Sequence, residues 1–373
     1  MNFSLSTESE ATTLESIQVE GFEHVFKVTN PKVKLTAIIS IHSTALGATG
    51  LGGTRIQPYP SFEIALEDAL RLSQAMTYKS AIAGVGYGGA KSVIIADPVK
   101  QKTPELLRAF ADAVQKLQGR YVCAEDVGSN LEDMRTFLER TPYVVGTPHP
   151  KSSGNPSPFT AWGIFRGIQA TLKKRFGSDS VEGKKIAVQG LGTVGSSLID
   201  TLFWAGAELI LSDIDMKKAE IFGKKYHAQV VDPEKILSVE CDLLAPCALG
   251  GILNRDTIPN LRCKAVAGAA NNQLRADSDA NLLRERSILY APDFVINAGG
   301  LINVAEELEK SGYNPFFARK KIDAIYDALL AIYEIAEKNQ ESTQQAATSL
   351  ANYRIRYGVG KRVIPPTFPS RGE

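Results

Sequence analysis

Two lysines lie close together in the segment AMTYKSAIAGVGYGGAKSVI. Lys79 and Lys91 are twelve residues apart, and four glycines lie between them. Glycine leaves a bare backbone that another group can approach closely. A solvated surface lysine is the ordinary alternative for either residue, but a lysine is almost never buried without a partner or a task. The lysine pair with its glycines is therefore a candidate binding site for an anionic ligand.

The two lysines are expected to divide two roles between them. Ammonium groups held near each other in a dry cleft disfavour each other's charge, and desolvation acts in the same direction. Both effects lower a lysine pKa from its usual value of about 10.4, so that one of the pair can act as a base near neutral pH. One lysine would stay charged and bind a carboxylate, while the other would be neutral and activate water.

A glycine motif predicts a dinucleotide site elsewhere in the chain. The segment GLGTVG lies between the strand-like KKIAVQ and the helix-like SSLIDTLFWAG. In such a unit Gly190 permits the tight turn, Gly192 lets the backbone approach the pyrophosphate, and Gly195 lets the helix pack on the strand. The phosphates then lie at a helix N-terminus. An ordinary strand and helix joined by a glycine turn is the alternative.

The next strand favours NAD as the cofactor. It ends in Asp213, which is 23 residues after Gly190 and close to the ~20 expected for an acid that binds the adenosine ribose. A carboxylate there repels a 2′-phosphate, although Lys217 and Lys218 follow closely.

An NAD site also changes the interpretation of Asp126, at the end of the apolar run in RYVCAEDVGSN. Such an acid is often a turn or N-cap residue, but beside a lysine pair it is a candidate proton shuttle.

The hydrophobic pattern supplies elements that would position these residues. After Pro60, apolar residues recur at helical spacing and define a stripe near which Lys79 would project. The stripe comprises Phe62, Leu66, Ala69, Leu72 and Met76. A further helix is predicted at 104–117, and strands at 34–42, 91–96, 121–124, 185–189, 208–212, 242–245, 265–270 and 287–290. The alternation in the second half predicts a parallel sheet covered by helices.

Length and composition bound the class of protein. With 373 residues and 44% hydrophobic content, two domains with a sizeable core are expected. The net charge of +1 argues against nucleic acid or an anionic membrane as partner. No signal-like start and no apolar run of about 18 residues are present, so a cytoplasmic protein is expected. The four cysteines and four histidines lack metal-ligand spacing, so we expect no metal site and buried, reduced thiols.

Taken together, the motifs resemble the amino acid dehydrogenase superfamily of glutamate, leucine, valine and phenylalanine dehydrogenases, with the leucine dehydrogenases most similar. The resemblance covers roughly residues 20–355. It runs through LGGTR at 51–55, MTYK at 76–79, GGAK at 88–91, AEDVG at 124–128, SSGNPSP at 152–158, APCALG at 245–250, AGAANNQL at 267–274 and INAGGLINV at 296–304.

The resemblance implies roles for these residues and a reaction. Lys79 would bind the substrate α-carboxylate, Lys91 would activate the water that attacks an imine, and Asp126 would exchange protons with the amino nitrogen. The implied reaction is the reversible oxidative deamination of an L-amino acid to a 2-oxo acid and ammonia. Beyond the three glycines and Asp213, the implied cofactor contacts are Thr193, Val194, Thr160, Pro246, Cys247, Ala248, Asn271 and Asn297.

The resemblance also bears on the substrate side chain. Gly52, Gly53 and Leu51 would line the substrate site, and Leu51 stands where glutamate dehydrogenases carry a lysine for the distal carboxylate. An apolar residue there would leave that charge unpaired, which disfavours glutamate; a plain core role for Leu51 is the alternative. Ala124, Leu301 and Val304 match other pocket positions. Because Leu301 departs from the more usual valine, aromatic substrates remain open beside the favoured branched-chain ones.

The expected architecture has a substrate-binding and oligomerisation domain at 1–150 and a doubly wound, Rossmann-type NAD domain at 151–314, consistent with the proline-rich and glycine-rich junction at 147–158. Helices at about 315–355 are expected to return to the first domain, with a disordered tail at 356–373 and the site in the cleft. The resemblance implies a homo-oligomer. A non-catalytic NAD-binding regulator is the alternative of another class.

Overall fold

The computed structural model describes residues 12–147 and 152–368. The chain forms two compact units, each built from more than one stretch of sequence. Unit 1 comprises Met1–Gly154, Val304–Asn314 and Arg354–Glu373, and unit 2 comprises Asn155–Asn303 and Pro315–Tyr353. The predicted junction at 147–158 contains the first change of unit, although its residues 148–151 lie outside the described residues.

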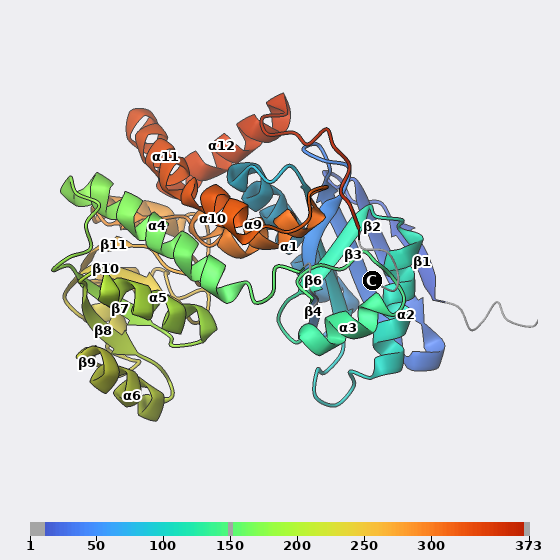
Figure 1. The fold of residues 1–373 in the computed structure, drawn as a ribbon, viewed down its shortest axis with the longest axis horizontal. Coiled ribbons are helices and arrows are strands. Elements are labelled where there is room, and N and C mark those ends of the chain that lie inside the picture. The colour runs from blue at the N-terminus through green and yellow to red at the C-terminus, as the bar shows by residue number, and fades with distance from the viewer. Residues whose placement is uncertain (1–11, 148–151, 369–373) are drawn as a thin grey trace, which may run out of the picture. The chain divides into compact units, whose positions relative to one another are not determined.

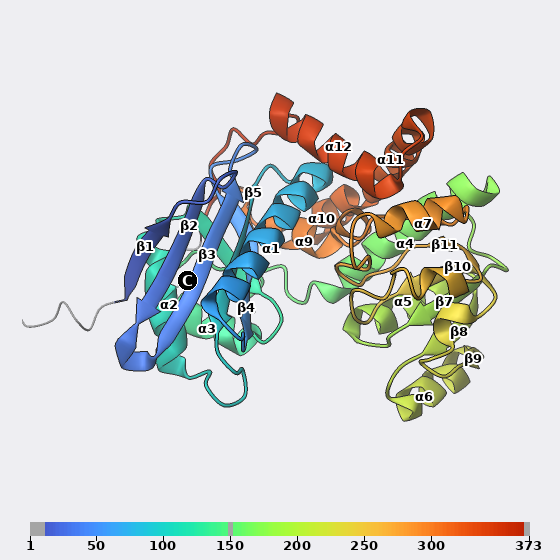
Figure 2. The same ribbon diagram turned by 180° about the vertical axis from the view of Figure 1, so that it is seen from behind.

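Unit 1 is built on a mixed sheet of six strands in the order β1-β2-β3-β5-β4-β6. Strands β1, β2, β3 and β5 pair antiparallel, whereas β4 runs parallel to both β5 and β6. Helix α1 covers one face, and α2 and α3 cover the other (Figures 1 and 2). The elements are β1 Thr13–Ile17, β2 His24–Asn30, β3 Leu35–Ser43, β4 Gly50–Gln57, α1 Phe62–Ala83, β5 Gly88–Ile95, α2 Pro104–Lys116, β6 Tyr121–Glu125 and α3 Leu131–Leu138.

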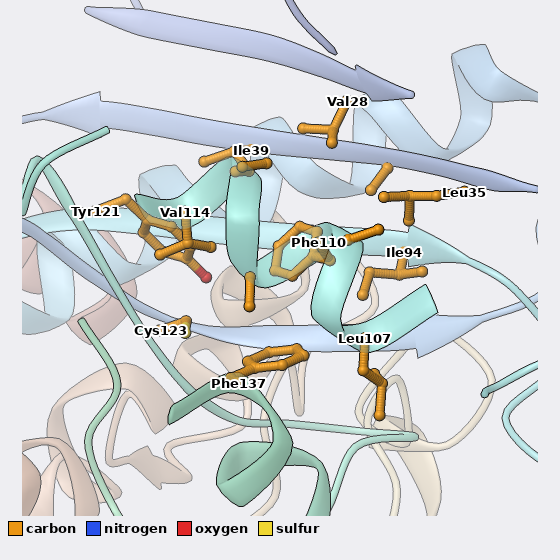
Figure 3. Packing of buried hydrophobic residues seen from close by; sticks show 14 of the residues in the cluster. Val28, Leu35, Ile39, Ile94, Leu107, Phe110, Val114, Tyr121, Cys123 and Phe137 are labelled. Atoms are coloured by element: carbon orange, nitrogen blue, oxygen red, sulfur yellow. The ribbon is translucent and has the colours of Figure 1, made fainter. Parts of the chain in front are cut away.

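Strand alternation decides which side chains face which helix. Ile39 and Ile94 lie in the core formed with α2 and α3, where Figure 3 shows them near Phe110. Val93 packs on the opposite face with Ala65 and other residues of α1. Because successive side chains of a strand point to opposite faces, Lys91 on β5 shares the face of Val93. The lysine therefore projects toward α1.

Helix α1 approaches the sheet closely because the strand beneath it is glycine-rich. A Cβ on Gly89 would lie 2.0 Å from the backbone nitrogen of Thr77, and one on Gly88 would lie 2.3 Å from the carbonyl oxygen of Ser43. These two glycines thus accommodate the protein's own backbone, rather than a ligand as the sequence suggested. The buried face of α1 is also rotated from the predicted stripe, because Thr77 is buried while Met76 is only partly so.

The strands that the apolar pattern predicted are confirmed, but β1, β2, β4 and β9 were missed. Strand β4 contains Gly50, Gly52 and Gly53, and glycine has a low strand propensity. Here the glycines serve packing, because a Cβ on Gly52 would lie only 1.7 Å from the carbonyl oxygen of Ala90 on β5. Glycine content therefore hid a strand whose close pairing depends on it.

Unit 2 is a parallel sheet of six strands in the order β12-β11-β10-β7-β8-β9. Numbered from β7, this is the 3-2-1-4-5-6 order of the doubly wound dinucleotide fold, with the switch point between β7 and β10. The predicted parallel sheet and Rossmann-type fold are confirmed. The strands are β7 Lys185–Gln189, β8 Glu208–Ser212, β9 Gln229–Val230, β10 Cys241–Pro246, β11 Cys263–Val266 and β12 Leu289–Tyr290.

The helices of unit 2 include most of the C-terminal helical region. They are α4 Ser157–Phe176, α5 Thr193–Trp204, α6 Met216–Tyr226, α7 Asp279–Glu285, α8 Asp293–Ile296, α10 Pro315–Asp323 and α11 Ile325–Asn339, while α9 Gly299–Ala305 and α12 Thr343–Tyr357 each end in unit 1. The expected return of 315–355 to the first domain is wrong for 315–353. Gly163 and Gly167 on α4 leave room for Ile325 and Leu329 of α11, which holds these helices in unit 2.

Two other segments, Val304–Asn314 and Arg354–Glu373, belong to unit 1 instead. The carboxylate of Glu307 accepts hydrogen bonds from the backbone nitrogens of Gly146 at 3.1 Å and Ser153 at 2.7 Å. Arg354 donates to the carbonyl oxygen of Ile82 at 2.7 Å, and Arg362 pairs with Glu309 at 2.9 Å. Of the disordered tail expected at 356–373, the first two residues end α12, and residues 358–368 have no regular secondary structure but are anchored through Arg362; residues 369–373 lie outside the described residues.

Within residues 12–147 and 152–368, no helix combines the length and the apolar character that a membrane crossing requires.

Gly128 fixes the loop that follows β6. Its φ is +80°, and a Cβ there would lie 1.8 Å from the carbonyl oxygen of Ile56 on β4. Gly21 has nearly the same φ, +81°, but no described atom lies within 4 Å of the Cβ position. An alanine at either position would therefore adopt the same left-handed conformation, but only an alanine at Gly128 would also clash with Ile56.

We expect Gly128→Ala to lower the free energy of unfolding by about 3 kcal/mol or more, and Gly21→Ala by only about 1–2 kcal/mol. The left-handed conformation costs both variants a similar amount, and only Gly128→Ala also displaces β4. Urea unfolding followed by far-UV circular dichroism measures the difference. Equal midpoints for the two variants would contradict the packing of this loop on β4.

Candidate active site

A buried ion pair marks the candidate site in unit 1. Lys91 is only 6% exposed, and its Nζ lies 3.0 Å from Oδ1 of Asp126. Lys91 comes from β5 and Asp126 from the residue directly after β6. The structure thus brings together two of the three predicted catalytic residues. It also gives Lys91 a carboxylate partner, which the expected lysine–lysine interaction had not included.

The backbone around Asp126 is held by β4. The backbone nitrogen of Asp126 donates to Oγ of Ser129 at 2.9 Å, and that hydroxyl donates to the carbonyl oxygen of Thr54 at 2.8 Å. The nitrogen of Ile56 donates to the carbonyl oxygen of Val127 at 2.9 Å. These bonds fix the loop over the strand, and with it the backbone from which the Asp126 carboxylate projects.

An arginine that the sequence analysis assigned no role contacts the same carboxylate. Nε of Arg55 lies 3.0 Å from Oδ2 of Asp126, and its Nη1 lies 2.9 Å from Oδ2 of Asp68 on α1. Tyr59 donates to the same oxygen of Asp68 at 2.6 Å. One signal was present in the sequence. In GGTRI the arginine directly precedes an apolar residue, Ile56, and an arginine that is buried requires a partner.

Two adjacent acids have opposite electrostatic environments. Burial alone would raise the pKa of Asp126, but the positive charges and hydrogen bonds of Lys91 and Arg55 outweigh it and lower this pKa below its usual value. Burial raises the pKa of Glu125, and the negative charges of Asp133 and Asp126 raise it further. Neighbouring acids whose pKa values are pushed apart are typical of acid–base sites. Asp126 is thus the more acidic of the two neighbours.

Gly53 packs directly beside the ion pair. A Cβ on Gly53 would lie 2.8 Å from Cβ of Asp126 and 3.4 Å from Nζ of Lys91. The backbone of the preceding residue is also held in place, because the buried hydroxyl of Tyr121 donates to the carbonyl oxygen of Gly52 at 3.0 Å. The predicted substrate residues Gly52 and Gly53 therefore border the Lys91–Asp126 pair.

The other predicted substrate residues are distributed over both units. Lys79 is half-buried on α1, two residues beyond the Thr77 that packs on β5. Leu51 is buried on β4, and Ala124 on β6 lies beside Gly53 in the strand register. Val304 is buried in unit 1, whereas Leu301 is buried in unit 2.

The glycine motif in unit 2 has the geometry that a dinucleotide requires. Gly190 has a φ of +95°, and a Cβ on Gly195 would lie 2.1 Å from the carbonyl oxygen of Gly190, so helix α5 packs tightly on β7. Gly192 is the N-cap of α5, and no described atom lies within 4 Å of its Cβ position. Thr193 and Val194 begin the helix there. The open side of Gly192 at a helix N-terminus suits a phosphate group.

Asp213 lies beside the glycine turn. Its Oδ2 accepts a hydrogen bond from the backbone nitrogen of Leu191 at 2.6 Å, and its Oδ1 accepts one from Asp215 at 2.9 Å. Both bonds orient the carboxylate at the end of β8. This is the position that a ribose-binding acid occupies in the doubly wound fold.

The remaining predicted cofactor residues also lie in unit 2. Asn297 donates to Oδ1 of Asn271 at 2.7 Å, and its own buried Oδ1 has no hydrogen-bond partner among the described residues. Thr160 begins the second turn of α4, and its hydroxyl donates to the carbonyl oxygen of Pro156 at 3.0 Å. Pro246 is the last residue of β10, and Cys247 and Ala248 follow it at the switch point, where the backbone nitrogen of Cys247 donates to the carbonyl oxygen of Gln189 on β7. A ligand amide would satisfy the unpaired oxygen of Asn297.

The described residues contain neither a cluster of metal-ligand side chains nor a disulfide. In the described part of the chain, no three histidine, cysteine, aspartate or glutamate side chains cluster as a metal site. The four cysteines are free, and burial raises the pKa of the Cys247 thiol to about 12.

Comparison with known proteins agrees with this geometry. Residues 22–143 match the sequence profile "Glu/Leu/Phe/Val dehydrogenase, dimerisation domain", and residues 211–359 match the profile "Glutamate/Leucine/Phenylalanine/Valine dehydrogenase". The chain belongs to this family. Its members are amino acid dehydrogenases that depend on pyridine nucleotides, so the family expected from the motifs is confirmed.

Several relatives match nearly the whole chain. The leucine dehydrogenase of Thermoactinomyces intermedius is 49% identical over 335 residues, which cover 90% of this chain and 91% of the relative. The L-tryptophan dehydrogenase of Nostoc punctiforme is 46% identical over 342 residues, which cover 91% and 95%. A crystal structure of L-tryptophan dehydrogenase from Nostoc punctiforme superposes with a TM-score of 0.80 at 45% identity, covering 91% of this chain and 97% of that chain.

The glycine motif generates a prediction about cofactor binding. Gly192→Ala is expected to weaken NADH binding by about tenfold or more, because its methyl group would project toward the phosphate position. Its thermal stability should stay unchanged, since the Cβ position is open. Gly195→Ala serves as the contrast and should lower the melting temperature. NADH titration by fluorescence and thermal unfolding measure the two effects, and an unchanged NADH affinity in Gly192→Ala would contradict the site.

Proposed function

We propose that the protein catalyses the NAD-dependent, reversible oxidative deamination of branched-chain L-amino acids, with leucine as the preferred substrate. The observation that carries this proposal is the buried Lys91–Asp126 pair, whose Nζ and Oδ1 atoms lie 3.0 Å apart and which is bordered by Gly53. The family and its leucine dehydrogenase relatives supply the reaction class.

Each group of unit 1 has a chemical role in this proposal. Lys79 binds the α-carboxylate of the substrate by a charge-assisted contact, which orients Cα for hydride loss. When NAD is bound by the residues of unit 2, it accepts the hydride from Cα. Gly52 and Gly53 are proposed to line the substrate site from β4, since Gly53 lies next to Asp126 and Lys91.

Lys91 and Asp126 then carry the hydrolysis. Lys91 first passes a proton to the Asp126 carboxylate and then, as the neutral amine, takes a proton from the water whose oxygen attacks the imine carbon. Asp126 delivers its proton to the amino nitrogen as the carbon–nitrogen bond breaks, and accepts the hydroxyl proton as the carbonyl forms. The products are the 2-oxo acid and ammonia. Because Nζ of Lys91 and Oδ1 of Asp126 lie in hydrogen-bond contact, a proton taken up by one group can pass to the other. The reverse direction uses the same groups in the opposite order.

Asp213 supports NAD rather than NADP as the cofactor. Its carboxylate lies at the end of β8 and is held by two backbone nitrogens. A fixed negative charge accepts hydrogen bonds from ribose hydroxyls and repels a 2′-phosphate. The basic residues that follow, Lys217 and Lys218, lie on α6.

The side-chain pocket supports an apolar substrate. Leu51 is buried and uncharged, so the distal carboxylate of glutamate would lose its solvation without a partner. A tryptophan or phenylalanine dehydrogenase is the second candidate, favoured by Leu301 and by the similarity to the L-tryptophan dehydrogenase of Nostoc punctiforme. Such pockets discriminate by only about 1–3 kcal/mol for each methylene.

We also propose a homo-oligomer built through unit 1, since residues 22–143 match a dimerisation domain.

The test is NADH formation by the purified protein with a panel of L-amino acids, with NADP in parallel. We expect leucine, isoleucine and valine to be turned over well above phenylalanine, tryptophan and glutamate, and NAD to be preferred. An aromatic amino acid that exceeds leucine tenfold would refute the branched-chain assignment and favour the second candidate. No turnover across the panel would refute the enzyme and favour the NAD-binding regulator.

A further inference from the structure

Arg55 contacts a proposed catalytic group but has no part in the chemistry described above. It lies on β4 with its side chain 16% exposed, on the α1 face of the sheet. Its guanidinium bridges two carboxylates that come from different elements, Asp126 after β6 and Asp68 on α1. A guanidinium shared between two carboxylates in a partly buried place is a device for holding geometry.

The bridge is itself held from the far side. Oδ2 of Asp68 accepts from Nη1 of Arg55 at 2.9 Å and from the hydroxyl of Tyr59 at 2.6 Å. Oδ1 of Asp68 accepts from Nη2 of Arg71 at 2.8 Å. The side chain of Asp68 is only 14% exposed. The oxygen of Asp68 that Arg55 binds is therefore also held by Tyr59, which restrains Arg55 from turning away from Asp126. The exposed Arg71 binds only the other oxygen.

The two oxygens of Asp126 have separate partners. Nε of Arg55 holds Oδ2 at 3.0 Å, which leaves Oδ1 directed at Nζ of Lys91, also at 3.0 Å. We propose that Arg55 is a positioning residue, which fixes the Asp126 carboxylate so that one oxygen faces Lys91. This inference rests on the proposed function, because the orientation that Arg55 imposes serves the proton transfer between Lys91 and Asp126.

Arg55 also supplies charge. The charged and titratable groups facing Asp126 are Lys91 on β5, Arg55 on β4, and Glu125 and Tyr121 on β6, with Asp68 beyond the guanidinium. Only Lys91 and Arg55 among these are positive. Removing the charge of Arg55 therefore raises the pKa of Asp126.

A lysine would not replace the bridge. Lysine has a single nitrogen, whereas Arg55 uses Nε for Asp126 and Nη1 for Asp68. The Arg55→Lys variant therefore keeps the charge and loses the geometry, and Arg55→Gln loses both. Arg71→Gln is the matched control, because Arg71 binds the same Asp68, lies on the surface at 54% exposure and is not bonded to Asp126.

The experiment is the pH profile of kcat/KM for leucine deamination in these three variants and the unaltered enzyme. In Arg55→Gln we expect the acid limb to move up by about one pH unit or more, with kcat lowered by about 10–100-fold and NADH affinity unchanged. Arg55→Lys should keep the original acid limb while kcat stays lowered. Arg71→Gln should stay within about twofold of the unaltered enzyme across the pH range.

The outcomes separate this inference from the proposed function. An unaltered protein without amino acid-dependent NADH formation refutes the proposed function, and the role of Arg55 falls with it. An active unaltered enzyme with an unmoved acid limb in Arg55→Gln refutes the role of Arg55 alone. If Arg55→Gln does not fold, Asp68→Asn takes its place. That variant should lower kcat with the acid limb unmoved, and an unchanged kcat would overturn the inference.

Discussion

A lysine ammonium and an aspartate carboxylate are held together in the interior of unit 1, and much of the surrounding structure compensates for that burial. Buried charges are costly unless they are paired and their remaining hydrogen bonds are satisfied. Lys91 and Asp126 satisfy one another, Arg55 occupies the second oxygen of Asp126, and Asp68 neutralises the arginine. The pair thus belongs to a network of alternating charges that extends from β5 to α1.

Glycine provides the space that this network and its ligands require. Gly89 lets α1 approach β5, Gly52 lets β4 pair closely with β5, and Gly53 lets β4 pack against Asp126, whose Cβ would lie 2.8 Å from a Cβ on Gly53. In unit 2 the same residue type has a different use, since Gly192 opens the helix N-terminus to a phosphate. Substitution of these glycines would therefore affect packing in one unit and binding in the other.

The parts of the fold predicted from sequence were those that local patterns determine. GLGTVG, the strands around it and Asp213 lie within one strand–helix–strand unit, and the parallel sheet followed from their alternation. Strand β4 was not predicted, because its glycines are explained only by the close contact with β5, which a local pattern does not reveal. Arg55 meets Asp126 from 71 residues away and Asp68 from 13, so no local pattern revealed the bridge. The place of 315–353 depends equally on distant contacts with α4.

The central claim is that Lys91 and Asp126 act as one unit, and a double-mutant cycle tests it most directly. The kcat/KM for leucine is measured in Lys91→Gln, Asp126→Asn and the double variant, with NADH affinity as the control for intact binding. Each single change should cost about a thousandfold or more, and the double variant should lose little beyond either, because removing one partner already disables the pair. Losses that multiply in the double variant would show that the two groups act independently and would contradict this account.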